Sequence, residues 1–132
     1  MAYATALSRD PAATYRQVDM VGRTATADAA GLVQLMYDEL VAALRAAAWA
    51  TENGKLAIRS DRVTRATAIL FALEAGLDFD KGGDLSRTLA GLYTGARRTV
   101  IEAAVGNDPR PFRETANNLE EIAQAWRAVR AG

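Results

Sequence analysis

The sequence contains no cysteine and no histidine. These absences exclude disulfides, thiolate nucleophiles, zinc sites built from Cys and His, and imidazole acid–base catalysis near neutral pH. Net charge is also lacking, because Lys+Arg and Asp+Glu both number 16. Without a long-range field to attract a polyanion, we expect no nucleic-acid partner.

Long apolar runs are missing as well. No stretch approaches the roughly 20 residues that span a bilayer, and the chain does not open with a basic segment followed by an apolar one. These features predict a cytoplasmic protein of the cytosol, without membrane insertion.

What the sequence does contain is small and aliphatic. Half of its 132 residues are hydrophobic and only 7% are aromatic. A chain of this length can bury a core as one domain, and its alanine-rich composition favours helices over sheet. Apolar residues recur at steps of three and four, and no run alternates as a half-exposed strand does. We predict four helices, over about 28–53, 56–77, 82–105 and 109–130.

The ends of these helices carry suitable residues. Asp28 is a good N-cap for the first helix and Gly54 a good terminator, while Pro109 and Pro111 suit the first turn of the last helix. Short connections between amphipathic helices predict an all-α fold, an antiparallel up-down-up-down four-helix bundle over residues 28–132. Residues 1–27 are predicted to form an extended or short-helical N-terminal arm that is partly mobile.

The stretch "LDFDKGGDLSRTLAGLY" interrupts the helical pattern with Gly82 and Gly83. Amide groups at the start of a helix can bind an anion, but the further glycines or the Lys-Ser/Thr pair of a phosphate loop are absent. We interpret the glycines instead as a tight reversal between the second and third helices, with Asp78, Asp80 and Asp84 near the start of the third.

No set of side chains suggests catalysis. Neighbouring acids such as Glu120 and Glu121 point about 100° apart on a helix and so do not converge. Di-iron bundles use a Glu-x-x-His pattern, which this chain cannot supply. We therefore expect no catalytic residue, no cofactor and no metal site, and a protein that is not an enzyme.

The apolar surface of the first helix is broader than one bundle seam requires. Val33, Tyr37 and Val41 form a ridge beside the ridge of Leu32, Met36 and Leu40. Three interpretations stay open. The stripe is a wide core face, a groove for a partner helix or extended peptide, or the interface of a self-assembling bundle such as a homodimer.

Four blocks of sequence, in order, carry a resemblance to a known family. They are "TYRQV" from Thr14, "TADAAGLVQLMYDEL" from Thr26, "AGLDFDKGGDLSRTLAGLYTGARR" from Ala75, and "AQAWRAV" from Ala123. Together they span almost the whole chain, and in order and spacing they resemble the bacterial flagellin export chaperones, the FliS family.

The resemblance implies a function and a partner. Members of the family are small helical bundles that bind the disordered C-terminal segment of flagellin in the cytosol, prevent premature polymerisation and assist delivery to the flagellar export apparatus. The implied partner is that flagellin segment, with a component of the export gate as a second candidate. The alternative is a self-assembling helical-bundle adaptor without a flagellin client.

The resemblance also implies partner-binding residues. In relatives the N-terminal arm can lie over part of the binding surface, which makes Tyr15 a contact or a displaceable cover. Tyr15, Tyr37 and Tyr93 are expected to face the partner, and Leu35, Leu92 and Trp126 to lie at least half in the core. The full expected set is Tyr15, Val18, Leu32, Leu35, Met36, Tyr37, Leu92, Tyr93 and Trp126.

The chain also departs from the family pattern. Ala29 and Gly31 replace better residues for a first turn, Gly95 stands where a bulky side chain is frequent, and Ala104 replaces a frequent asparagine. We expect Gly95 to reshape any groove beside it.

Overall fold

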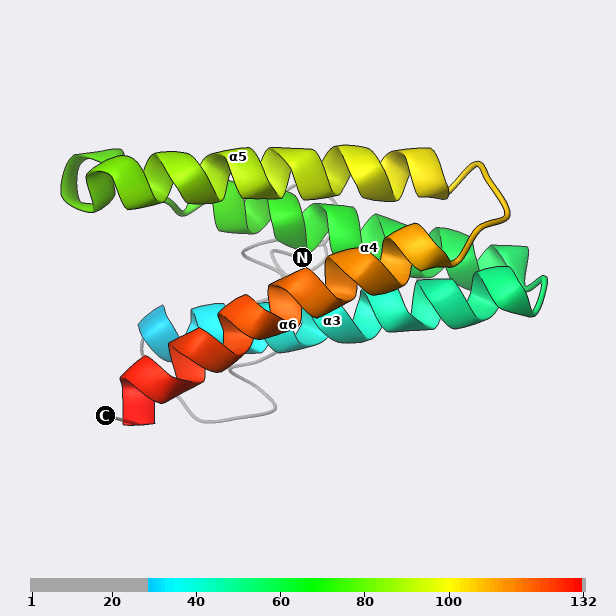
Figure 1. Ribbon diagram of the computed structural model, residues 1–132, viewed down its shortest axis with the longest axis horizontal. Coiled ribbons are helices and arrows are strands. Elements are labelled where there is room, and N and C mark those ends of the chain that lie inside the picture. Colours follow the sequence, from blue (N-terminus) through cyan, green and yellow to red (C-terminus); the bar gives the residue numbers. More distant parts are fainter. Residues whose placement is uncertain (1–28, 132) are drawn as a thin grey trace, which may run out of the picture.

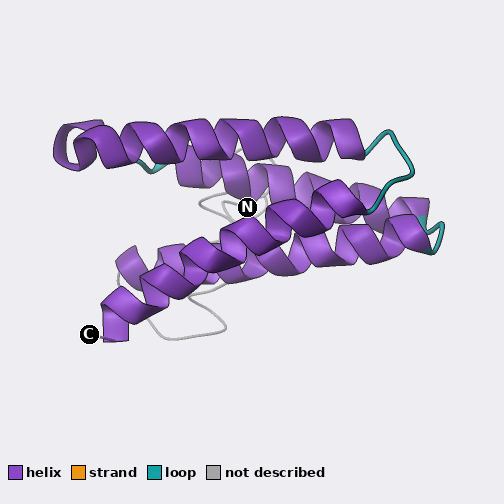
Figure 2. Cartoon of the chain, viewed as in Figure 1, coloured by secondary structure: helices purple, strands orange, loops and turns teal. Residues whose placement is uncertain are grey.

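The chain folds into four helices. The computed structural model describes residues 29–131, and the side chains of residues 29–129. The helices are α3 (Ala29–Glu52), α4 (Leu56–Ala75), α5 (Phe79–Ala103) and α6 (Arg110–Ala131). Short loops join them, and residues 29–131 contain no strand (Figures 1 and 2). The prediction of an all-α bundle is confirmed.

Successive helices run in opposite directions (Figure 1). Each helix packs on the next in the chain, and α6 returns to pack on α3, so that α3 and α5 lie diagonally across the bundle. In Figure 1 α6 runs obliquely to α5, and the two helices separate toward the start of α5 and the end of α6.

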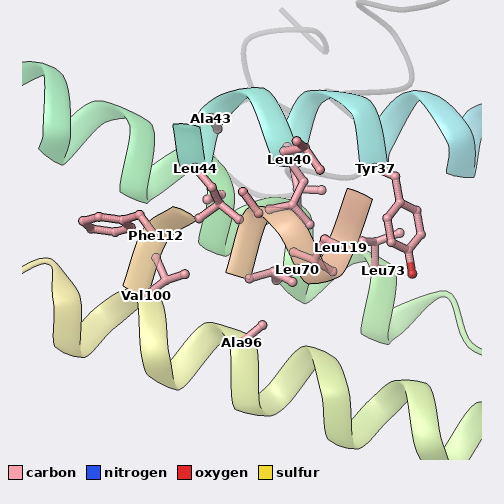
Figure 3. Close-up of a cluster of buried hydrophobic side chains, with 14 of the residues drawn as sticks. Tyr37, Leu40, Ala43, Leu44, Leu70, Leu73, Ala96, Val100, Phe112 and Leu119 are labelled. Atoms are coloured by element: carbon pink, nitrogen blue, oxygen red, sulfur yellow. The ribbon is translucent and has the colours of Figure 1, made fainter. Parts of the chain in front are cut away.

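The core lies where the four helices meet (Figure 3). Its fully buried side chains include Leu40 and Leu44 of α3, Leu70 of α4, and Phe112 and Leu119 of α6. Each such side chain stabilises the fold by about 1.5–3 kcal/mol through burial alone. Both ridges of α3 are buried from Met36 onward, while Leu32 and Val33 at their start are half-buried, so most of the wide apolar stripe of that helix is core.

Alanine explains how α3 can pack against α4 and α6 at once. Ala43, Ala47, Ala48 and Ala50 are all buried on this helix. Small side chains let neighbouring helices approach closely while keeping a strong helical propensity. These buried alanines let α3 lie close to both of its neighbours.

The connection between α4 and α5 differs from the prediction. The second helix ends at Ala75, two residues early, and α5 begins at Phe79 rather than at residue 82. Asp78 caps α5 by accepting a hydrogen bond from the Lys81 N–H at 3.0 Å. One helical turn from Phe79 thus precedes the glycine pair, which the prediction placed directly between the two helices, and the backbone is non-helical at Gly83.

The glycine pair instead kinks α5 after its first turn. Gly83 adopts φ 50° and ψ −123°, a conformation that favours glycine. A Cβ on Gly82 would stand 1.9 Å from the Ser86 Oγ, which donates a hydrogen bond to the Asp78 carbonyl at 2.9 Å. Glycine at both positions lets Ser86 fasten the first turn to the rest of the helix.

The opposite end of the bundle is closed by two polar contacts. Asp108 accepts a hydrogen bond from the Arg110 backbone N–H at 2.9 Å, which fixes the start of α6. The Arg59 guanidinium donates to the Gly106 carbonyl at 2.7 Å and ties the loop before α6 to α4. Among the described residues, no helix is both long enough and apolar enough to cross a membrane.

Candidate functional site

An apolar hollow opens where α5 and α6 separate. It has a volume of about 220 Å³, and its walls come from the first half of α5 and the second half of α6. The lining residues are Leu85, Leu89, Ile122, Ala125, Trp126 and Val129. Large apolar side chains thus face a space that the described part of the chain leaves open.

Two of these side chains are strongly exposed. Leu85 is 62% exposed and Val129 73%, although both stand at helical positions that the sequence assigns to the core seam. The oblique course of α6 removes the facing helix from these positions (Figure 1). Their spacing alone predicts core residues, but both are apolar surface.

A second hollow continues along the same two helices. Its volume is about 270 Å³, and it lies nearer the middle of the bundle. Its lining residues are Gly91, Leu92, Gly95, Ala96 and Thr99 of α5 with Thr115, Asn118 and Leu119 of α6. We call the two hollows together the α5–α6 groove, with an apolar end (Leu85 to Val129) and a glycine end (Gly91 to Leu119).

The tyrosines predicted to face a partner do not lie in this groove. Tyr37 and Tyr93 are both buried, and their hydroxyl groups form a hydrogen bond with each other. Figure 3 shows Tyr37 within the cluster of core side chains. The expectation that both are partner-facing is therefore wrong, because each phenol finds its polar partner inside the bundle.

Burial also changes the acidity of these phenols. It raises the pKa of Tyr37, an effect that the contacts with Tyr93 and Trp126 partly oppose. Burial raises the pKa of Tyr93 further, and its hydrogen bond to Tyr37 raises it again. The Trp126 indole N–H is buried near this pair, yet it makes no hydrogen bond of ordinary geometry within residues 29–129. Both phenols stay neutral at physiological pH, so neither can act as a base.

The other predicted residues divide between core and groove. Met36 is buried, which corrects its assignment as a partner contact. Leu32 and Leu35 are half-buried at the start of α3. Leu92 and Trp126 are half-buried, as expected, and both line the groove. Tyr15 and Val18 lie outside the described residues.

Much of the groove escaped sequence reasoning. Leu85, Leu89, Ile122 and Val129 have the spacing of core residues, and the tilt of α6 that exposes two of them leaves no local signal. Gly95 did carry a local signal in the sequence, because a glycine within a helix lowers helix stability and therefore indicates a packing or functional role.

The lining of the groove has the chemistry of a binding surface. No charged side chain lines either hollow. No group of acidic side chains among the described residues could hold a metal ion. An apolar trough between two helices is the usual seat of an amphipathic helix from another chain.

A helical bundle with such a trough belongs to the class of proteins that bind a segment of another protein. The sequence matches the family described as "Flagellar protein FliS" over residues 11–132, and the chain belongs to that family.

Similar proteins from several bacteria are named flagellar secretion chaperones. It is 29% identical to the flagellar secretion chaperone FliS of Salmonella typhimurium, over 87% of this chain and 86% of that one. The flagellar secretion chaperone FliS of Campylobacter jejuni is 31% identical over 74% of this chain and 77% of its own length. The flagellar secretion chaperone FliSB of Pseudomonas aeruginosa is 26% identical, with 87% and 91% covered.

Proposed function

We propose that this protein is a cytosolic flagellar secretion chaperone that binds the disordered C-terminal segment of flagellin. The binding prevents premature polymerisation of flagellin and assists its delivery to the flagellar export apparatus. Membership of the FliS family supports the class of function, and the exposed apolar end of the α5–α6 groove supports the mode of binding.

The physical basis is the covering of one apolar face by another. A flagellin segment with an apolar face would self-associate if left free, and the groove offers Leu85, Leu89 and Val129 as a competing surface. Ordering such a segment on binding costs about 2–5 kcal/mol of the gross interaction energy. The net affinity is then moderate, which allows release at the export gate, where a gate component is the second expected partner.

Binding without catalysis is sufficient for this role. The described residues offer no convergent charged groups in the groove, and the two phenols beneath it are neutral. The chaperone therefore acts only by covering the apolar face of the bound flagellin segment, and this protection ends when the segment dissociates.

Titration calorimetry tests the proposal directly. The full chain is titrated with a synthetic peptide of the flagellin C-terminal segment from the same organism. We expect saturable binding with a negative heat-capacity change, the mark of buried apolar surface. Absence of heat at tens of micromolar, with helical circular dichroism intact, would refute the proposal.

Light scattering provides the matched control. A self-assembling adaptor would associate through the same apolar surface and show a mass that rises with concentration. A chaperone of the proposed kind should remain a monomer until the peptide is added.

A further inference from the structure

The indole of Trp126 connects the groove to the core of the bundle. It lines the apolar end of the groove, and it also packs against the cluster of buried side chains. Its exposure is intermediate, as expected for a ring that lies between a hollow and the interior. Trp126 therefore belongs to the binding surface and to the core at once.

The N–H group of this indole is buried without a partner. Among the buried side-chain polar atoms of residues 29–129, only Trp126 Nε1 and Gln34 Oε1 make no hydrogen bond. An indole N–H can only donate, so it needs an acceptor. A buried donor without one is costly, and nearly all such groups in folded proteins are paired. The binding surface thus rests on a side chain with an unmet hydrogen bond.

An acceptor lies close to this N–H. The Arg127 guanidinium donates to the Asp38 carboxylate at 2.9 Å, which brings the preceding residues of the two helices, Trp126 and Tyr37, near each other. The contact with Trp126 acts to lower the pKa of Tyr37, as a donor directed toward the phenol oxygen does. The Tyr37 hydroxyl can accept two hydrogen bonds and donate one, and its bond to Tyr93 uses one of these three.

The indole lacks packing on the side that faces the groove. The hollow of about 220 Å³ opens against it, between Leu85 and Val129, which are both strongly exposed. Protein interiors are otherwise closely packed, so a ring beside a hollow has room to change its orientation. An apolar side chain that fills the hollow removes this room and favours the orientation that satisfies the N–H.

We propose that Trp126 is a positioning residue of the groove: when an apolar side chain of the client fills the apolar end, the indole N–H donates to the Tyr37 hydroxyl. This inference rests on the proposed function and specifies how the groove responds to its client. The Tyr37 hydroxyl donates in turn to Tyr93, so that one chain of hydrogen bonds joins α6, α3 and α5. A segment that leaves the hollow unfilled gains nothing from this bond.

Nuclear magnetic resonance observes the indole N–H directly. The chain contains two tryptophans, so the indole region of a ¹H–¹⁵N spectrum holds two signals. Trp49→Phe removes one of them and assigns the other to Trp126. Trp49 is 49% exposed and lines neither hollow, so its own signal in the parent chain is the internal control. On addition of the flagellin peptide, the Trp126 signal should move downfield and exchange more slowly with solvent, and the Trp49 signal should do neither.

Removal of the acceptor tests the identity of the partner. Tyr37→Phe should abolish the downfield shift of Trp126 on binding and weaken the peptide about two- to tenfold, the value of one hydrogen bond. Trp126→Phe keeps an aromatic ring but has no N–H. In that background, the further change Tyr37→Phe should no longer weaken binding, because the bond is already absent.

The outcomes separate this inference from the proposed function. If the peptide binds by calorimetry but the Trp126 signal does not move, or moves equally in Tyr37→Phe, the inference is refuted and the chaperone function stands. If the peptide does not bind the parent chain, the chaperone function is refuted and the inference with it. The spectrum of the parent chain is decisive by itself, so the test holds even if Tyr37→Phe does not fold, which circular dichroism establishes.

Discussion

The hydroxyl group of Tyr37 on α3 forms a buried hydrogen bond with the hydroxyl group of Tyr93 on α5. Their rings stand 6.3 Å apart between centroids and are tilted by 56°. This contact joins two helices that lie diagonally across the bundle, 56 residues apart in sequence. Because Tyr93 follows Leu89 by one helical turn, the bond also holds the wall of the α5–α6 groove in place.

Removal of one hydroxyl should destabilise the fold. Tyr93→Phe leaves the Tyr37 hydroxyl buried without its partner, which costs about 1–3 kcal/mol. Tyr37→Phe should cost a similar amount. The double substitution removes both polar groups and should cost less than the sum of the two single ones. Urea unfolding of the four chains measures the three differences, and simple additivity would show that the two hydroxyls do not interact.

Removal of the Tyr93 ring tests whether Tyr93 is a core residue or a surface contact. Tyr93→Ala should lower the free energy of unfolding by about 3–5 kcal/mol, as expected for a buried aromatic side chain. A partner-facing tyrosine would tolerate the change. An unchanged melting temperature in this variant would therefore contradict the buried position of Tyr93.

The same pair makes the fold sensitive to alkali. Burial raises the pKa of both phenols in the folded chain above the ordinary tyrosine value of about 10. Above that pH the unfolded chain loses protons that the folded chain keeps, so the free energy of unfolding falls as the pH rises. The contribution is fully present below pH 10 and decreases from there upward. Urea unfolding between pH 9 and pH 11.5 should show this decrease, and Tyr37→Phe/Tyr93→Phe should lose most of it.

The helices could be predicted from the sequence, whereas the exposure of many side chains could not. The period of apolar residues and the terminating Gly54 are local signals, because each depends on neighbours within one or two turns. The Tyr37–Tyr93 bond depends on residues far apart in the chain. A tyrosine suits an interface and a core equally well until its polar partner is known.

The exposed apolar end of the α5–α6 groove could not be predicted from the sequence for the same reason, because it depends on residues far apart in the chain. Leu85 and Val129 have the spacing of seam residues, and only the tilt of α6 leaves them without a facing helix. A helix's tilt is set by packing along its whole length, which no single motif encodes. Leu92 and Trp126 could be identified as groove residues only through the resemblance to the FliS family.

The glycines of α5 should respond to alanine with opposite signs. Gly91→Ala and Gly95→Ala place a methyl group in open space and improve helical propensity, so each should raise the free energy of unfolding by up to about 1 kcal/mol. Gly83→Ala forces an alanine to φ near +50° and should lower it by about 1–2 kcal/mol. Urea unfolding of the three variants tests the contrast. A loss of stability in Gly91→Ala would mean that the space above α5 is already filled.

A charge placed at the apolar end of the groove should weaken binding strongly without unfolding the chain. Leu85→Asp puts a carboxylate at a position that is 62% exposed in the free protein, so the melting temperature should change little. In a complex that covers this position, the carboxylate would be buried without a partner, which is strongly unfavourable. We expect the flagellin peptide to bind at least about tenfold more weakly by calorimetry.

Val105→Asp is the matched control for this substitution. Val105 is 87% exposed, but it follows α5 at the opposite end of the bundle and lines neither hollow. The two variants carry the same new charge and the same loss of an exposed apolar side chain, so they differ only in position. If both weaken binding equally, the client is sensitive to net charge and not to the groove. If only Val105→Asp weakens it, the client lies at the loop end of the bundle. The α5–α6 groove is the binding surface only if Leu85→Asp alone has the effect.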